Sequence, residues 1–136
     1  MATFNKIESF VEKLAEKVLN LGSDQLTIAL TNTAHTSSWD ELADLTQVAY
    51  TNLSTRNITT SSSAQTTGTY KLVLADLVLT STGGTTGAFR YVYIYDDTAV
   101  TDTLIGYYDY GSSITLQDGD TFTIDFDGSG GVLTIA

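Results

Sequence analysis

The chain has 136 residues, of which 42% are hydrophobic, and this is the size of one ordinary domain with a core of its own. There is no Cys, so disulfides, thiolate metal sites and cysteine nucleophiles are excluded. The formal net charge is -10, and a surface of that sign repels nucleic-acid phosphates and anionic membranes. We therefore expect a partner that is neither a nucleic acid nor a membrane.

The first 22 residues predict one N-terminal helix. Thr3 is a candidate N-cap and Gly22 a candidate stop. Apolar residues recur between them at spacings of three and four, which is the helical period: Ile7, Phe10, Val11, Leu14, Val18 and Leu21. The apolar face of this helix either covers the sheet of the domain or contacts a neighbouring subunit.

The period then changes to two. Residues 26–30 alternate Leu and Ile with Thr and Ala, which predicts a half-buried strand. Residues 32–52 hold the single His and the single Trp of the chain and read as a long loop, with one helical turn at 40–45.

Residues 53–81 are rich in Ser and Thr and predict a hairpin. Its arms are residues 56–61 and 70–80, joined by a turn at 64–68. The apolar residues of the second arm change parity halfway along, which predicts a bulge or bend near Ala75–Asp76.

Residues 89–95 predict a central strand, because aromatic residues alternate along one side and Val92 and Ile94 occupy the other. Its hairpin partner is 104–110, across the acidic loop 96–103. Three further short strands follow turns rich in Gly and Asp: 114–116, 121–126 and 132–135. The whole chain, 1–136, thus predicts a single domain that is mainly β, an antiparallel β-sandwich or barrel-like body with one N-terminal α-helix.

Three kinds of residue are candidates for chemistry. The only base for a Ser-His-Asp arrangement is His35, which lies in a loop without a nucleophile turn, so we interpret it as a surface or loop-packing residue. Paired carboxylates could serve a glycosidase, but each pair sits at a turn or strand end, where Asp bonds the backbone. The pairs are Asp96/Asp97, Asp118/Asp120 and Asp125/Asp127.

Two glycine-containing segments are candidates for ligand binding. Residues 125–131 begin like a calcium loop, but the later bidentate Glu is missing, which favours a hairpin turn. Residues 83–87 lack the Lys-Ser/Thr and the helix of a phosphate loop. The sequence therefore predicts no enzyme, and no catalytic, cofactor or metal site.

Contact residues are the remaining candidates. Six of the eight Tyr residues lie between 91 and 110, and such side chains occur both in β cores and at protein interfaces. We expect Tyr107, Tyr108 and Tyr110 to face outward, because their strand also carries Gly106 and Asp109. Phe10 and Leu14 on the predicted helix complete the candidate interface residues.

Four strings resemble small virion proteins of tailed bacteriophages, of the capsid decoration (cement) type. They are SFVEKLAEKVLNLGSDQLTIALTN near the start, AFRYVYIYDD from Ala88, LIGYYDYG from Leu104, and DGDTFTIDFDGSGGVLTIA at the end. The likeness runs over nearly the whole chain, although residues 34–46 match no such pattern.

The resemblance implies a homotrimer on the outside of the head that binds the major capsid protein and clamps neighbouring subunits. No cofactor is implied. The start has no signal peptide and no segment is as long and apolar as a membrane span, so we expect synthesis in the host cytoplasm before incorporation into the virion. The alternatives are a tail or head-fibre component, and a free-standing carbohydrate- or ligand-binding β module that uses the Tyr residues.

Overall fold

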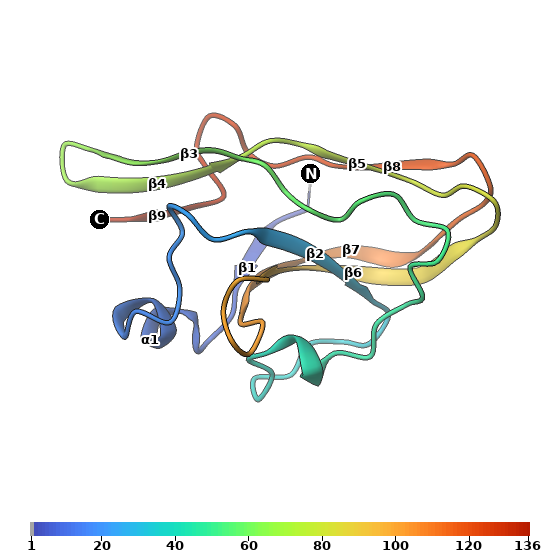
Figure 1. The fold of residues 1–136 in the computed structure, drawn as a ribbon, viewed down its shortest axis with the longest axis horizontal. Helices are drawn as coiled ribbons and strands as arrows, with labels where there is room; N and C mark the ends of the chain where they lie inside the picture. The colour runs from blue at the N-terminus through green and yellow to red at the C-terminus, as the bar shows by residue number, and fades with distance from the viewer. Residues whose placement is uncertain (1) are drawn as a thin grey trace.

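Two layers of antiparallel strands make up most of the structure, a computed structural model that describes residues 2–136 (Figure 1). The first layer is a four-stranded sheet in the order β1 (Phe4–Lys6), β7 (Leu104–Leu116), β6 (Thr86–Asp96) and β2 (Leu26–Thr31). The second layer contains two smaller sheets. They are β3 (Thr60–Thr66), β4 (Thr69–Leu74) and β9 (Leu133–Ile135) in one, and β5 (Leu77–Thr80) and β8 (Thr121–Ile124) in the other. The prediction of a mainly β, sandwich-like antiparallel body is confirmed.

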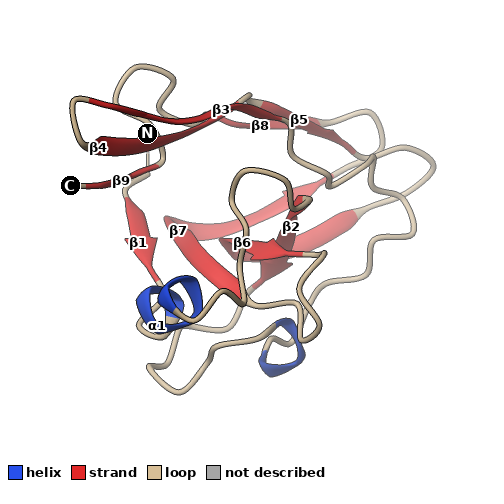
Figure 2. Ribbon diagram, turned by 60° about the vertical axis from the view of Figure 1, so that its left-hand side comes forward, coloured by secondary structure: helices blue, strands red, loops and turns tan. Residues whose placement is uncertain are grey.

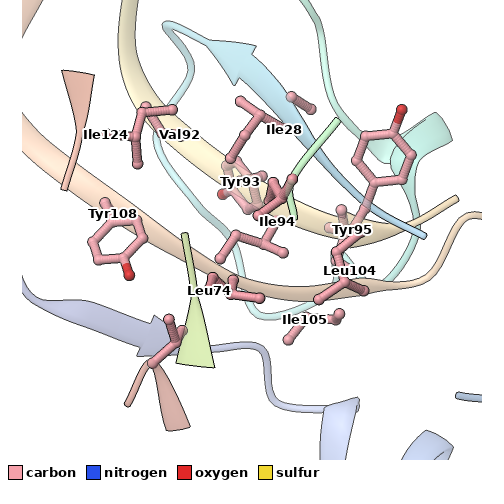
Figure 3. Close-up of a cluster of buried hydrophobic side chains, with 14 of the residues drawn as sticks. Ile28, Leu74, Val92, Tyr93, Ile94, Tyr95, Leu104, Ile105, Tyr108 and Ile124 are labelled. Carbon is pink, nitrogen blue, oxygen red and sulfur yellow. The ribbon is translucent and has the colours of Figure 1, made fainter. Parts of the chain in front are cut away.

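The core lies where the two layers face one another. Leu74 of β4 and Ile124 of β8 are buried beside Val92 and Tyr108 of the four-stranded sheet, as Figure 3 shows. Both layers are apolar on the facing side, and this shared burial stabilises the sandwich. The buried side chains form one cluster through the described residues.

Strand β6 is central, as predicted, because β7 pairs with one of its edges and β2 with the other. The prediction that its aromatic residues share one side is wrong for Phe89. The register with β7 shifts between Phe89 and Tyr91, so Phe89 contacts Phe122 of the second layer. Tyr91 instead contacts Tyr107, on the outer face of the four-stranded sheet. An extra residue in one strand reverses the direction of the side chains beyond it.

Strand β2 is buried along its full length, whereas the sequence predicted a half-buried strand. Residues 46–58 run beside its outer edge, where the Ile28 N–H donates to the Arg56 carbonyl and the Val48 N–H donates to the Leu30 carbonyl. The predicted helical turn in the loop before this segment is confirmed as a short 3-10 helix at Leu42–Asp44.

The N-terminal helix is much shorter than predicted. α1 covers Phe10–Ala15, with Ser9 as its N-cap in place of Thr3, and Lys17 has a left-handed φ of 64° that stops its continuation toward Gly22. Residues 4–6 are extended instead and pair with β7, where Phe4 lies opposite Tyr108. Figure 2 shows β1 leading from the second layer down to α1. No helix within residues 2–136 is long and apolar enough to cross a membrane.

The predicted hairpin is present, but its first strand begins later than expected. β3 is Thr60–Thr66 rather than 56–61, and the turn is at Thr67–Gly68, where both residues have positive φ. The predicted break at Ala75–Asp76 is confirmed, because it separates β4 from β5. The Asp76 carboxylate there accepts the Phe126 N–H at 2.9 Å.

Candidate protein interface

His35 lies in an aromatic cluster on the outer face of the four-stranded sheet. Its ring stacks on Tyr107 with centroids 4.7 Å apart and meets Trp39 edge-on. Its Nε2 is 3.1 Å from the Glu8 carboxylate and its Nδ1 is 3.0 Å from the Tyr93 hydroxyl. A carboxylate only accepts, so Nε2 carries a proton and donates to Glu8, while Nδ1 and the Tyr93 hydroxyl share the second hydrogen bond.

The carboxylate, imidazole and hydroxyl in a row are the groups of a nucleophilic triad, but the hydroxyl is inaccessible. Tyr93 is fully buried, and this burial raises the pKa of its phenol well above the ordinary value. A substrate would have no path to the Tyr93 oxygen. The arrangement instead fastens residues 32–39 to the sheet, which confirms the loop-packing interpretation of His35.

The acidic pairs organise turns. Asp118 accepts the Gly83 N–H at 2.8 Å and Asp120 accepts the Gln117 N–H at 2.9 Å, so both carboxylates close loops. Backbone bonding by Asp at turns is confirmed for these residues. It holds for Asp127 as well, which accepts the N–H groups of Ser129 and Gly130. These bonds lower the pKa of the Asp127 carboxyl and hold Asp127–Gly130 as a tight turn. The predicted hairpin turn is wrong, because β8 pairs with β5 and β9 pairs with β4, so the 125–131 segment links two different sheets.

Asp96 differs from the solvated turn residue that the sequence suggested, because it is fully buried. Its Oδ1 accepts the N–H groups of Thr98 and Ala99, each at 3.0 Å. Its Oδ2 is buried without a hydrogen-bond partner, and the Asp24 side chain lies beside it. Burial, reinforced by the neighbouring Asp24 side chain, raises the pKa of the Asp96 carboxyl to about 7.

The predicted contact residues divide between core and surface. The outward orientation predicted for Tyr108 is wrong, because it is only 3% exposed and contacts Phe4 and Phe126 in the core. The prediction is also wrong for Tyr110, whose half-buried ring meets Phe122 of the second layer edge-on, and burial raises the pKa of its hydroxyl to about 12. Tyr107 is half-buried on the outer face of the four-stranded sheet. The structure therefore leaves little Tyr surface for a partner.

The helix candidates also divide. Phe10 is 2% exposed and belongs to the core, so it cannot be a direct contact residue. Leu14 is half-buried and lines an open groove between α1 and β9. This short helix therefore contributes Phe10 to the core and Leu14 to the wall of the groove.

We call this feature the α1–β9 groove. It consists of two adjoining depressions of about 410 and 400 Å³ that share Leu14 and Ile135 as walls. Val11 and Ile135, which are 51% and 43% exposed, lie on its two sides. α1, β9 and the C-terminus lie at the same end of the molecule in Figure 1. In the described residues, β9 pairs only with β4, so the strand edge facing away from β4 is open.

The groove is cationic although the protein is acidic. Lys6 lines one depression and Lys17 the other, and no Asp or Glu lines either. Within residues 2–136, neither lysine makes an ion pair or a side-chain hydrogen bond. The other four cations are engaged: Lys13 with Asp40, Lys71 with the Ser129 carbonyl, Arg56 with the Ile28 carbonyl, and Arg90 with Asp109. An apolar groove with uncompensated positive charge at its rim is typical of a contact site.

Sequence reasoning identified the strand at 132–135 and an apolar helix face, but it did not bring them together. The groove is lined by segments more than one hundred residues apart, and no local pattern encodes their proximity. In comparisons with protein-family models, curated proteins and solved structures, nothing matched this chain.

Proposed function

We propose that this protein is a structural component of a tailed-bacteriophage virion, of the capsid decoration type. It binds the major capsid protein on the outside of the head and stabilises the shell by clamping neighbouring subunits. The protein acts as a homotrimer, and each copy offers the same contact surface. Several modest contacts made together hold a decoration protein far more firmly than one contact does.

The observation that carries this proposal is the α1–β9 groove, an assembly surface that each copy offers to a neighbouring subunit of the trimer. The body around it is rigid, because the strands of both layers share one core. Exposed apolar side chains at the groove, Val11 and Ile135, are the groups that become buried when proteins assemble. The resemblance of the four sequence strings to virion proteins supports the same conclusion. The strong negative charge elsewhere keeps the protein soluble before assembly and away from packaged DNA.

The alternatives have less support. A tail or head-fibre component would use the same contact surface with a different virion partner. A ligand-binding module would rest on exposed Tyr side chains, but Tyr91, Tyr93, Tyr95 and Tyr108 are all less than 10% exposed. This leaves the ligand-binding alternative without a specific observation in its favour.

Co-sedimentation with virus particles tests the proposal. Heads and tails would be purified separately from a virus that lacks this gene, and each would be mixed with the purified protein. We expect saturable binding to heads and a higher temperature of head disruption. Binding to tails alone would favour the tail alternative. Binding to neither would contradict a virion role.

A further inference from the structure

One apolar residue of the protein is completely exposed. Val100, at the tip of the loop between β6 and β7, is 101% exposed. Asp97 lies on one side of it in an exposed position, and Asp102 on the other side is half-buried. Burial and the nearby Asp97 charge raise the pKa of the Asp102 carboxyl. We call residues 97–102 the Val100 knob.

The Val100 knob is held in a fixed shape from inside. The buried Asp96 carboxylate accepts the N–H groups of Thr98 and Ala99, and the Asp102 N–H donates to the Ala99 carbonyl at 3.1 Å. Outside bonds hold it as well, because the Gln25 N–H donates to the Thr98 hydroxyl and the Leu42 N–H to the Asp102 carbonyl. A contact made by a preorganised loop loses little conformational entropy on binding.

The Val100 knob and the α1–β9 groove are complementary. The knob is an apolar tip between two carboxylates, and the groove is an apolar hollow with a lysine at each depression. Glu12 and Glu16 lie near the groove on α1 but do not line it. Within residues 2–136, Lys6 and Lys17 have no carboxylate partner, and the two carboxylates of the knob have no cation partner.

We propose that the α1–β9 groove binds the Val100 knob of a second copy of this chain. Val100 inserts between Val11 and Ile135, while Asp97 and Asp102 approach Lys6 and Lys17 of the neighbouring copy. The contact joins two different patches, so each copy uses its knob on one neighbour and its groove on another. The angle between the two patches sets the number of copies that closes the ring.

Self-association of the isolated protein is the measurement. Sedimentation velocity over a range of concentrations is recorded for the wild type and for two variants, Val100→Asp in the knob and Val11→Asp in the groove. Both positions are exposed, so the fold tolerates the change, and circular dichroism melts check this. We expect each variant to weaken association by about tenfold or more. Val78→Asp is the matched control, because Val78 is also 51% exposed but lies on β5 outside both patches.

Mixing the two variants gives the sharper result. Val100→Asp keeps an intact groove and Val11→Asp keeps an intact knob. A mixture should form a one-to-one complex through the single intact contact, although each variant alone stays monomeric. A charge reversal gives a second check: Lys17→Glu should weaken association, and Asp97→Lys in a partner variant should partly restore it. Salt of about 0.5 M should weaken the wild type, because exposed ion pairs are screened.

Several results would overturn the inference. These are a monomeric wild type at all concentrations and low salt, an assembly that Val100→Asp leaves intact, a mixture that fails to pair, or a Val78→Asp variant that dissociates equally. The inference concerns contacts between copies and is measured without virus particles. A monomer that binds heads would refute the knob contact but keep the proposed function. An oligomer that depends on Val100 but binds neither heads nor tails would keep the knob contact and refute the proposed function.

Discussion

The imidazole Nε2 of His35 lies 3.1 Å from the Glu8 carboxylate, and this contact joins two segments that are far apart in sequence. Glu8 precedes Ser9, the N-cap of α1, and His35 belongs to the segment that crosses the outer face of the sheet. The same ring bonds the buried Tyr93 hydroxyl. One side chain thus fastens both the start of the helix and the long loop to the central strand.

Replacing His35 should therefore destabilise the fold. His35→Phe keeps a ring that can stack on Tyr107 but removes both hydrogen bonds and leaves the buried Tyr93 hydroxyl without a partner. We expect a loss of about 1–3 kcal/mol in the free energy of unfolding, measured by urea denaturation. Glu8→Gln is the control and should change it less, because the Glu8 side chain is 55% exposed. Equal effects of the two variants would contradict this account.

Truncation of two neighbouring residues of α1 should destabilise the protein by very different amounts. Phe10 is 2% exposed, so Phe10→Ala leaves a cavity and should cost about 3–5 kcal/mol of unfolding free energy. Val11 is 51% exposed and faces the groove, so Val11→Ala should cost about 0.5 kcal/mol or less. Chemical denaturation of both variants checks the assignment of Phe10 to the core. A small effect of Phe10→Ala would restore it as a contact residue.

Most strands were predictable because their signals are local. The alternation in residues 89–95, the change of parity at Ala75–Asp76 and the Gly and Asp turns each mark a strand or its end within a few residues. The errors occur where distant segments decide the structure. Pairing with β7 makes residues 4–6 a strand, although the sequence placed them in the predicted helix. Residues 46–58 bond the outer edge of β2, which is buried along its full length.

The candidate interface was only partly predictable for the same reason. Leu14 was identified from helical spacing, and the structure does place it at the α1–β9 groove. The opposite wall is β9, which neither hydrophobic pattern nor spacing relates to the helix. Tyr108 was assigned to the wrong face, because Tyr107 and Tyr108 point to opposite sides of β7 and only the packing of the second layer decides which side is buried.

Gly106 should resist any enlargement. The Phe4 ring of β1 lies over it so closely that an added Cβ would overlap two ring carbons, and the Asn5 carbonyl oxygen would be 2.8 Å away. Gly106→Ala should therefore displace β1 and cost about 1–3 kcal/mol of unfolding free energy. Faster amide hydrogen exchange at residues 4–6 would locate the effect.

Gly128→Ala is the matched control for that substitution. A Cβ at Gly128 meets nothing within 4 Å, and its φ is not in the left-handed region. We expect its melting temperature to stay close to that of the wild type. A Gly106→Ala variant as stable as Gly128→Ala would mean that β1 and its ring move aside at no cost.

The buried Asp96 should make stability depend on pH. Its pKa rises from 3.8 to about 7 on folding, because it is buried and lies beside the Asp24 side chain, so the folded protein binds a proton that the unfolded chain releases near pH 4. The free energy of unfolding contributed by this group is therefore highest below pH 4. It falls as the pH rises from about 4 to 7 and is constant above that range.

Asp96→Asn should remove this dependence. The Asn Oδ1 can still accept the N–H groups of Thr98 and Ala99, and its neutral amide places no charge beside Asp24. Urea denaturation at pH 5 and at pH 8 gives the free energy of unfolding of both proteins. The value for the variant minus the value for the wild type should be about 1–3 kcal/mol larger at pH 8 than at pH 5. The Asp127 carboxyl has a lowered pKa and is ionised throughout this range, so the cost of Asp127→Asn should be the same at both pH values. The opposing result is a free energy of unfolding of Asp96→Asn that differs from that of the wild type by the same amount at both pH values, as expected for Asp127→Asn. In that case Asp96 would have to be ionised in the fold at pH 5. Its two backbone bonds would then outweigh burial and the contact with Asp24.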